Sequence, residues 1–499
     1  VFYEVFVRSF ADSDGDGIGD LPGVTAHLDD LNDGNPATTA DLGITGLWLM
    51  PVAESASYHG YDVTDYRAIE HDYGDAADFH ALVDAAHERG IKVVVDFVPN
   101  HTSKQNPWFR DAEQHGPHDA WYVWSPTDPG YAGPDGQQVW HRDEDGRFYY
   151  GVFGDGLPDL NLRNPDVTKE LHSIAKYWLE DMGVDGLRVD AAKHLLEDGE
   201  KQTNTAETKA WLTAFRDDVH GALRDSLVLG EVWDPRGITS SYPASGAVDL
   251  VFDFEVGGAI LGSVRLGDAG TLKTTESELG SRYPPGSVAT FLSNHDQPRF
   301  MSQLSGDATA AKAAAAALLL APGVPFVYYG EELGMTGTKP DERIRTPYPW
   351  TASAPGFGFT SGTPWEQFGD NAVTANVESE RKDGSSLLAT YRDLIRVRTS
   401  HPALSSGTVV PLDSSPSSVA AFLRRDATET LVVIHALSKD AVSGATLDVP
   451  AEALCGRPTG DVIYGPAGAP RTIVPPIAGT EWRLPDLPGR SSWVIRLSP

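Results

Sequence analysis

Three acidic residues in this chain have the types and neighbours that cleavage of a glycosidic bond requires. Asp190, Glu231 and Asp296 each follow a short apolar run, and each has an Arg, Trp or His within two residues. Glycosidases need one carboxylate that attacks the anomeric carbon and one carboxylic acid that protonates the leaving oxygen and later activates water. If the fold brings these acids together, they provide the two carboxyl groups that glycosidases need.

The elements that would bring them together are short apolar runs, which are typical of strands buried on both faces. In chain order they are Val1–Val7, Ile44–Met50, Lys92–Val98, Gly186–Val189, Leu227–Val232, Leu250–Phe254, Val288–Leu292 and Val324–Tyr329. Eight strands that alternate with helices predict an α/β fold with a closed (β/α)8 TIM barrel. Because barrel enzymes place their chemistry at the carboxyl ends of the strands, the three acids should meet at one mouth.

The segments between these runs carry helix signals. An apolar helical face over residues 79–86 is followed by Gly90, which is typical of a helix stop. Asn164 and Pro165 are typical of a cap and a first helical turn, and Gly183 ends that pattern.

Two regions interrupt the alternation. Residues 102–161 are aromatic and rich in Gly, Pro and Asp, and a structureless loop of that length is uncommon. After about residue 400 the helical pattern gives way to strands between turns. We therefore expect a barrel formed by residues 1–101 and 162–400, an inserted domain of residues 102–161 after the third strand, and a C-terminal antiparallel β-sandwich domain of residues 401–499.

The segment Asp12–Asp20 places a carboxylate at nearly every second position, between small residues. Oxygen ligands with this spacing suit Ca²⁺. The segment begins like an EF-hand loop, but residue 23 is Gly where a bidentate Glu would stand, which excludes a complete EF-hand.

Several stretches resemble the signature regions of the α-amylase family, glycoside hydrolase family 13, and the resemblance extends from Val1 to Pro499. The stretches that carry it are Asp96–His101, Leu157–Asn161, Gly186–His194, Gly230–Trp233, Ser293–Asp296 and Gly330–Met335. Two others, Leu31–Pro36 and Tyr58–Asp62, look like the bacterial group between true α-amylases and oligo-1,6-glucosidases.

The resemblance implies a role for each acid. Asp190 would be the nucleophile, Glu231 the general acid/base, and Asp296 the residue that stabilises the transition state through sugar hydroxyls. Arg188 lies on the same strand face as Asp190 and should keep that carboxylate ionised. The other substrate-binding residues that the resemblance implies are Tyr61, His101, Lys193, His194 and His295.

Calcium is the cofactor that the resemblance implies. Related proteins carry the ion in a loop after the first strand, where Asp12, Asp14, Asp16 and Asp20 would bind it by their side chains and Ile18 by its carbonyl. A second calcium in true α-amylases is bound by residues like Asn100, Asp159 and the carbonyl of His194. A purely structural role for Asn100 is the alternative.

Composition limits the partners. The chain has 71 acidic and 39 basic residues, with a formal net charge of −32, which disfavours nucleic acid and is compatible with a neutral substrate. The acidity indicates either a well-solvated surface or adaptation to salt. No apolar run is long enough for a membrane span. Cys455 is the only cysteine, so no internal disulfide is expected.

The expected function is hydrolysis of α-1,4 bonds in starch and maltooligosaccharides. The alternatives are an α-1,6-glucosidase, an α-glucan transglycosylase, an isomerase of sucrose or trehalose, or a domain that has lost catalysis. Ala191 favours α-1,4 bonds because α-1,6-acting relatives typically have Val there, whereas Asn161 and Asp62 lean toward the oligo-1,6-glucosidases. No signal peptide is visible, and we expect a secreted or extracytoplasmic monomer whose leader is not present in this chain.

Overall fold

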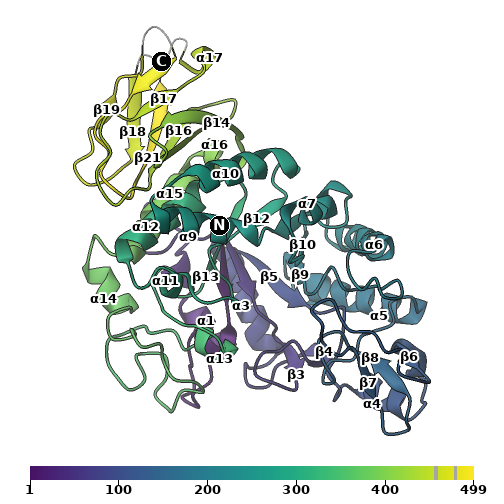
Figure 1. The fold of residues 1–499 in the computed structure, drawn as a ribbon. Helices are drawn as coiled ribbons and strands as arrows, with labels where there is room; N and C mark the ends of the chain where they lie inside the picture. Colours follow the sequence, from purple (N-terminus) through teal and green to yellow (C-terminus); the bar gives the residue numbers. More distant parts are fainter. Residues whose placement is uncertain (455–458, 477–479, 499) are drawn as a thin grey trace.

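The computed structural model describes residues 1–454, 459–476 and 480–498, so Cys455 lies outside the described residues. Its centre is a closed barrel in which neighbouring strands run parallel, in the order β1-β13-β12-β11-β10-β9-β5-β2 (Figure 1). Each apolar run predicted from the sequence contains one barrel strand. The strands are β1 (Phe2–Val5), β2 (Gly46–Leu49), β5 (Lys92–Phe97), β9 (Gly186–Val189), β10 (Leu227–Gly230), β11 (Leu250–Phe252), β12 (Val288–Thr290) and β13 (Val324–Tyr328).

Large side chains fill the inside of this barrel, as expected when eight strands close around a packed core. Trp48, Phe252, Phe291 and Phe326 form one apolar cluster there. A second and larger cluster lies between the strands and the surrounding helices, so every barrel strand is covered on both sides. Because both faces of these strands are buried, the strands appear in the sequence as continuous apolar runs.

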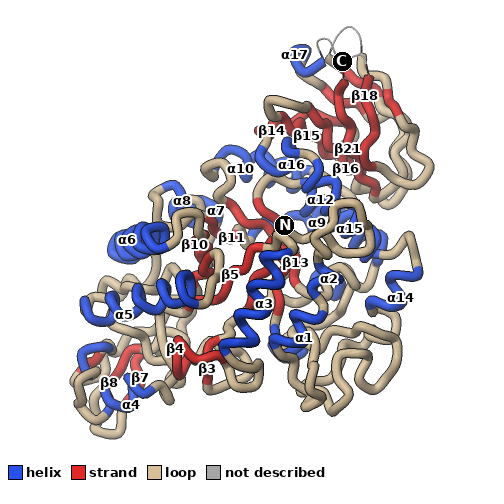
Figure 2. Tube along the Cα trace, turned by 180° about the vertical axis from the view of Figure 1, so that it is seen from behind, coloured by secondary structure: helices blue, strands red, loops and turns tan. Residues whose placement is uncertain are grey.

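Helices surround the strands, as the view from behind shows (Figure 2). Those of the barrel and its loops are α1 (Leu21–Ala26), α2 (Leu28–Leu31), α3 (Ala76–Glu88), α5 (Pro165–Lys176), α6 (Ala206–Ala222), α7 (Arg236–Thr239), α8 (Ser241–Ala244), α9 (Glu255–Leu266), α10 (Gly270–Arg282), α11 (Phe300–Gln303), α12 (Ala308–Leu320), α13 (Asp341–Ile344), α14 (Val377–Lys382) and α15 (Leu387–Ser400).

The residues predicted to begin and end the helix after residue 164 do so in the structure. The Asn164 side chain accepts a hydrogen bond from the N–H of Asp166 and caps α5, with Pro165 in the first turn. A π-helical turn, Tyr177–Asp181, extends α5, and Gly183 follows with φ of +80°. None of the described helices has the length and apolar character needed to cross a membrane.

Two insertions extend the barrel near the carboxyl ends of its strands. After β2, the strands β3 (Ala53–Ser55) and β4 (Val63–Ile69) form an antiparallel hairpin. After β5, the chain forms α4 (Pro107–Glu113) and a three-stranded sheet of β6 (Trp124–Ser125), β8 (Phe148–Tyr150) and β7 (Trp140–Arg142). This second insertion lies within the segment that the sequence predicts as an inserted domain.

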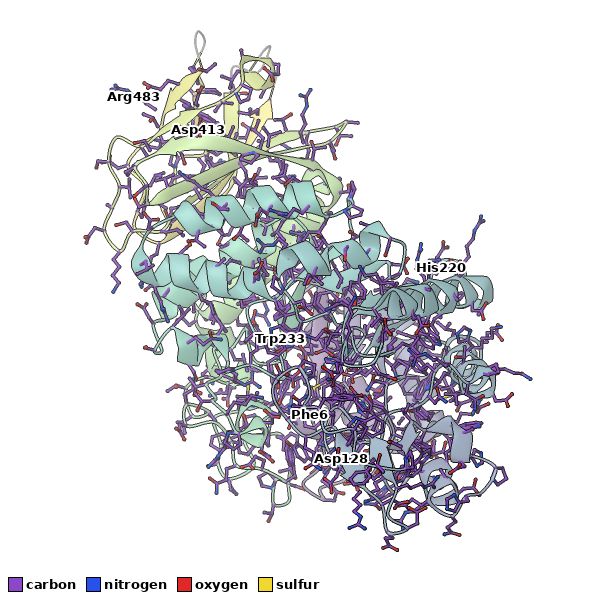
Figure 3. All side chains as sticks on the ribbon, turned by 45° about the vertical axis from the view of Figure 1, so that its right-hand side comes forward. Phe6, Asp128, His220, Trp233, Asp413 and Arg483 are labelled. Atoms are coloured by element: carbon purple, nitrogen blue, oxygen red, sulfur yellow. The ribbon has the colours of Figure 1, made fainter. Side chains whose placement is uncertain are left out.

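The chain ends in an antiparallel β-domain that packs against α10, α12 and α15 (Figure 1). Figure 3 marks it with Asp413 and Arg483, at the opposite end of the molecule from Asp128 in the second insertion. The elements are α16 (Pro402–Ser406), α17 (Ala451–Leu454), β14 (Thr408–Ser415), β15 (Val419–Arg425), β16 (Thr430–Ala436), β17 (Thr446–Asp448), β18 (Thr459–Tyr464), β19 (Thr472–Ile473), β20 (Glu481–Arg483) and β21 (Ser491–Ser498).

The predicted β-sandwich is built from one continuous sheet. Its strand order is β19-β18-β21-β16-β15-β14-β17-β20, and β14 pairs with both β15 and β17. Leu447 and Trp482 from one end of the sheet share an apolar cluster with Val432 and Ile495 from its middle. The sheet therefore bends around its own core, which lies apart from the barrel core.

Candidate active site

The three predicted catalytic acids lie at one mouth of the barrel. Asp190 directly follows β9, Glu231 directly follows β10, and Asp296 lies in the loop after β12. All three line one cavity of about 760 Å³, a volume typical of a ligand site. The expectation that separate strand ends would bring these acids together is met.

Arg188 is the shared cation of this mouth. Its guanidinium donates to Asp96 Oδ1 at 2.5 Å and to Asp190 Oδ1 at 2.6 Å, and its second nitrogen lies 3.0 Å from Glu231 Oε2. The arginine side chain is 1% exposed, and Asp96 is directly opposite it in the β5–β9 register. One buried cation therefore holds three carboxyl groups in fixed positions.

One cation cannot neutralise three ionised carboxylates, so this cluster favours retention of a proton. Burial raises the pKa of Asp190 well above its ordinary value, Arg188 opposes that shift, and Glu231 and Asp96 add to it. Burial likewise raises the pKa of Asp96 to about 6. Of the groups around Asp190, Arg188 is the one that favours the ionised carboxylate, as the sequence predicts, but burial and the two neighbouring acids outweigh it.

The backbone next to Asp190 helps to orient Glu231. Ala191 has φ of +50°, in the left-handed region that side-chain-bearing residues rarely occupy. In this conformation the Ala191 N–H donates to Glu231 Oε2 at 2.9 Å. The strained turn after Asp190 thus fixes one oxygen of Glu231.

His295 connects the third acid to the barrel interior. Its Nδ1 lies 2.5 Å from Glu4 Oε1, and its Nε2 lies 2.8 Å from the Tyr61 hydroxyl and 3.1 Å from Asp296 Oδ2. Burial alone would lower the pKa of His295, but the carboxylates of Asp296 and Glu4 raise it to about 10. The imidazole is therefore a cation at neutral pH.

Asp296 is held ionised by two cations. Burial would raise its pKa, but His295 and Arg345 lower it below the ordinary range. Arg345 donates to Asp296 Oδ1 at 3.0 Å and to the His295 carbonyl oxygen at 3.0 Å. A permanently charged carboxylate suits the role of binding sugar hydroxyls and stabilising positive charge, and not that of a proton donor.

Two other histidines face the cavity in the neutral form. Burial lowers the pKa of His101 to about 3 and that of His194 to about 4. Both line the cavity, and His101 Nε2 has no hydrogen-bond partner among the described residues. Lys193 also lines it, with Nζ 2.6 Å from the Trp233 carbonyl oxygen. These polar groups are available to a ligand.

Sequence reasoning missed part of the site. Asp96, Glu4 and Arg345 position the predicted residues, and the signal for the first two was an acid inside an otherwise apolar strand. Phe153 and Trp233 also line the cavity and are 44% and 45% exposed, so their rings are available for stacking on sugars. Asp62 does not line the cavity; it accepts a hydrogen bond from Ser57 Oγ at 2.7 Å.

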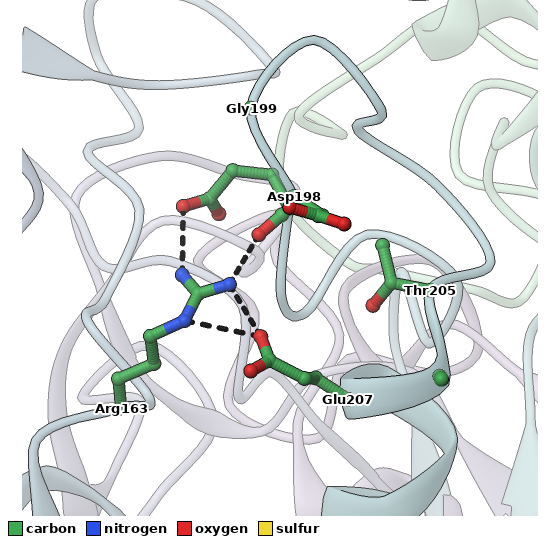
Figure 4. A pocket seen from close by; sticks show the side chains of 7 residues that line it. Arg163, Asp198, Gly199, Thr205 and Glu207 are labelled. Carbon is green, nitrogen blue, oxygen red and sulfur yellow. Dashed lines mark hydrogen bonds and ion pairs between the residues drawn. The ribbon is translucent and has the colours of Figure 1, made fainter.

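A second polar hollow lies beside α6, outside the catalytic mouth (Figure 4). The guanidinium of Arg163, which lines this hollow, pairs with Glu197 at 3.1 Å and with Glu207. The single cation that lines this hollow is thus paired with two of its acids. None of the predicted site residues lies in it, and it offers no second catalytic constellation.

The loop after the first strand gathers three of the four aspartates predicted to bind calcium. Oxygens of Asp12, Asp14 and Asp20 lie within 4.8 Å of one another. Asp16 is outside this group, and its Oδ1 accepts a hydrogen bond from the N–H of Ile18 at 2.7 Å. A set of three hard oxygen donors fits Ca²⁺.

Asn100 and Asp159, predicted to share a second calcium site, lie on neighbouring segments, because His101 and Asp159 form an antiparallel bridge. The Leu160 N–H donates to the Asn100 carbonyl oxygen at 2.8 Å, and Asp159 Oδ1 accepts from the Val152 N–H at 3.1 Å. Burial raises the pKa of Asp159 well above its ordinary value. One buried acid and one amide do not by themselves define a cation site, so this second site stays a prediction.

Comparison with known proteins agrees with this geometry. The family model "Alpha amylase, catalytic domain" matches residues 4–407. The chain is 37% identical over 446 residues to "Alpha-amylase 3" of Dictyoglomus thermophilum, covering 88% of this chain and 85% of that one. It is 31% identical over 519 residues to the oligo-1,6-glucosidase of Parageobacillus thermoglucosidasius, covering 88% and 90%.

Among solved structures, the α-amylase from H. orenii superposes with a TM-score of 0.87 at 37% identity. The match covers 100% of this chain and 99% of that one. Family model, relatives, fold and the arrangement of three acids around one mouth all agree. The chain belongs to the α-amylase family of glycoside hydrolases.

Proposed function

We propose that this chain is a retaining hydrolase of α-1,4-glucosidic bonds in starch and maltooligosaccharides. The observation that carries the proposal is the contact of Arg188 with both Asp190 and Glu231 at the base of one open cavity. In this arrangement one acid can be ionised while its neighbour retains a proton. Those are the two states in which retaining hydrolysis begins.

The chemistry follows from these positions. Glu231 gives its proton to the glycosidic oxygen as the bond to the anomeric carbon breaks, while Asp190 attacks that carbon and forms a glycosyl-enzyme ester. Glu231, now a carboxylate, then takes a proton from water, and the water oxygen displaces Asp190. Asp296, with Tyr61, His101 and His295, would bind the sugar in the cleaved subsite, and charged Asp296 would stabilise the oxocarbenium-like transition state.

Ala191 supports the preference for α-1,4 bonds. It lines the cavity directly after the nucleophile, and its left-handed backbone disfavours a β-branched residue. The larger Val typical of α-1,6-acting relatives would narrow the space beside the leaving-group sugar, and one or two methyl groups are worth about 1–3 kcal/mol of discrimination. The identity of 37% to an α-amylase, against 31% to an oligo-1,6-glucosidase, points the same way.

The alternative is an α-1,6-glucosidase or an α-glucan transglycosylase of the same family. Phe153 and Trp233 favour binding of an acceptor sugar, because exposed rings at the cavity can stack on a second glucan chain. Transfer instead of hydrolysis would use the same glycosyl-enzyme and replace water by a sugar hydroxyl. Lys193 and His194 would then contact the acceptor.

Calcium and location are part of the proposal. We propose one Ca²⁺ held by Asp12, Asp14 and Asp20, with Asp16 and the Ile18 carbonyl as additional ligands, and a structural role for it. The close approach of three carboxylate oxygens supports this. We also propose a secreted or extracytoplasmic monomer, consistent with an extracellular polymer as substrate.

The bond preference is tested with matched trisaccharides. Initial rates on maltotriose and isomaltotriose, at equal concentrations, should differ at least about 10-fold in favour of maltotriose. Products longer than maltotriose would show that the enzyme transfers glycosyl groups to sugar acceptors. Their fraction of all products at early times measures the ratio of transfer to hydrolysis. Equal or faster cleavage of isomaltotriose would overturn the α-1,4 assignment. An Ala191→Val variant should reduce the preference for maltotriose.

A further inference from the structure

The hairpin that carries Tyr61 has a cluster of metal-ligating side chains at its base. Tyr61 lies in the connection between β3 and β4, and its hydroxyl reaches His295 in the catalytic mouth. At the other end of the hairpin, Glu54 lies in β3, and Glu70 and His71 directly follow β4. One oxygen from each carboxylate and one imidazole nitrogen lie within 4.8 Å of one another.

Glu70 is oriented toward this point by the hairpin itself. Its Oε2 accepts hydrogen bonds from the Ser55 N–H at 2.9 Å and the Ser55 hydroxyl at 3.1 Å. Its Oε1 faces His71 Nδ1 at 3.2 Å. The residue is 5% exposed, so this carboxylate is buried with one oxygen anchored and the other directed at the imidazole.

Glu54 has the same arrangement. Its Oε2 accepts the His71 backbone N–H at 3.0 Å, and its Oε1 lies 3.0 Å from the same Nδ1. His71 Nδ1 can carry only one hydrogen, and the shorter of its two contacts is with Glu54. Glu70 Oε1, which lies 3.2 Å from the same Nδ1, therefore shares this single nitrogen with Glu54.

The remaining ring nitrogen also has a partner. His71 Nε2 lies 3.4 Å from Asp72 Oδ1, and the other Asp72 oxygen pairs with Arg8. Metal-bound histidines typically turn their second nitrogen toward a carboxylate, which fixes the orientation of the ring. The cluster thus has three candidate ligands, and each of them is held by a further group.

We propose that Glu54, Glu70 and His71 form a binding site for a borderline divalent metal of the Zn²⁺ class. A donor set of one imidazole nitrogen and two carboxylate oxygens suits Zn²⁺, unlike the all-oxygen set of the Asp12 loop. The His71 side chain is 72% exposed, which leaves room for water as a further ligand. The ion would join β3 to the end of β4 and so brace the hairpin that presents Tyr61.

The test is direct metal binding to the whole protein with Ca²⁺ in excess, so that all-oxygen sites are filled. Zn²⁺ is titrated calorimetrically, and Co²⁺ is used as a visible probe of coordination by nitrogen and oxygen. We expect one Zn²⁺ per chain. His71→Ala and Glu70→Gln should each weaken Zn²⁺ binding about 100-fold or more, because even outer partners of a metal site contribute about 10- to 100-fold.

His115→Ala is the matched control. His115 is also exposed and lies near two carboxylates, at 3.0 Å from Asp145 and 3.8 Å from Asp119, but no three-ligand group forms around it. Its loss should leave Zn²⁺ binding unchanged. Zn²⁺ should also raise the melting temperature of the wild type and of His115→Ala but not of His71→Ala.

Two results would overturn the proposal. One is the absence of stoichiometric Zn²⁺ binding in the wild type. The other is equal binding by the wild type, His71→Ala and Glu70→Gln. Either result would identify the cluster as an imidazolium paired with carboxylates only. Because His71 and Glu70 have no place in the catalytic mouth, neither result bears on the proposed hydrolysis.

Discussion

The catalytic mouth and the Asp12–Asp20 loop both concentrate carboxylates, but they balance the charge in different ways. In the mouth, buried Arg188 contacts three acids, and His295 and Arg345 hold a fourth. In the loop, Asp12 is held mainly by backbone N–H groups and by Thr360, and Asp20 by Ser13 and Gly23. No Lys or Arg is paired with Asp12, Asp14 or Asp20 among the described residues.

This difference separates a cluster suited to acid–base chemistry from one suited to binding a cation. A buried arginine between acids keeps them close while leaving protons to be shared, which is useful for acid–base chemistry. Acids that have no cation of the chain beside them repel one another, and a bound metal ion would relieve that repulsion. We therefore expect substitutions in the mouth to affect turnover and changes in the loop to affect stability.

The largest expected effect is on turnover. Asp190→Asn should lower kcat on the order of 10⁴-fold or more, because it removes the attacking carboxylate. Glu231→Gln should cost about 10²- to 10⁴-fold on maltooligosaccharides, since it removes a general acid. On α-glucosyl fluoride, whose leaving group needs no proton, Glu231→Gln should form the glycosyl-enzyme at near-normal rate while Asp190→Asn stays inactive.

Steady-state kinetics on both substrates, with folding checked by circular dichroism, measure this prediction. A variant of either acid that turned over maltotriose at near wild-type rate while folded would remove that residue from the mechanism. If both variants lost activity on α-glucosyl fluoride to the same extent, the division of roles between Asp190 and Glu231 would be contradicted.

The next largest effect is on stability. Removal of Ca²⁺ by a chelator should lower the melting temperature, because an ion present at 100 times its Kd stabilises the native state by about 2.7 kcal/mol. Asp14→Asn should reduce this Ca²⁺ dependence more than Asp16→Asn does, since only Asp14 belongs to the close group. Scanning calorimetry with and without Ca²⁺ compares the two. An unchanged melting temperature after verified metal removal would refute the loop as a calcium site.

The smallest effect is that of salt. Because 71 acidic residues face 39 basic ones, activity should persist at molar NaCl, where the Debye length falls to about 3 Å and surface repulsion is screened. Salt should also diminish the destabilisation caused by the chelator, because the Asp12–Asp20 loop is partly exposed. The interactions of the buried acids with Arg188 should not change with salt. Loss of activity in molar salt with the fold intact would count against this expectation.

Much of this organisation could be predicted from the sequence, because it depends on local patterns. Apolar runs located all eight barrel strands, and the position of Asp190 and Glu231 at strand ends located the mouth. The contribution of Asp96, Glu4 and Arg345 could not be predicted in this way. It depends on the register between β5 and β9 and on contacts between residues far apart in the chain, such as Arg345 with Asp296.

The Asp12–Asp20 loop shows the same limit. Its alternating acids indicated a cation site, but spacing alone could not separate Asp16 from the three acids whose oxygens converge, because the turn of the loop decides this. The further cluster of Glu54, Glu70 and His71 had no signal in the sequence. It forms only because the bulged β3–β4 pairing brings the two ends of the hairpin together.

The central claim is that Asp190 attacks the anomeric carbon and carries the glycosyl group. The most direct measurement is to trap that ester with 5-fluoro-α-glucosyl fluoride and to locate the added mass in proteolytic peptides. A single label on Asp190, formed in the wild type and in Glu231→Gln but not in Asp190→Asn, is the predicted result. A label on another residue, or none while substrate is hydrolysed to the β-anomer, would contradict the retaining mechanism.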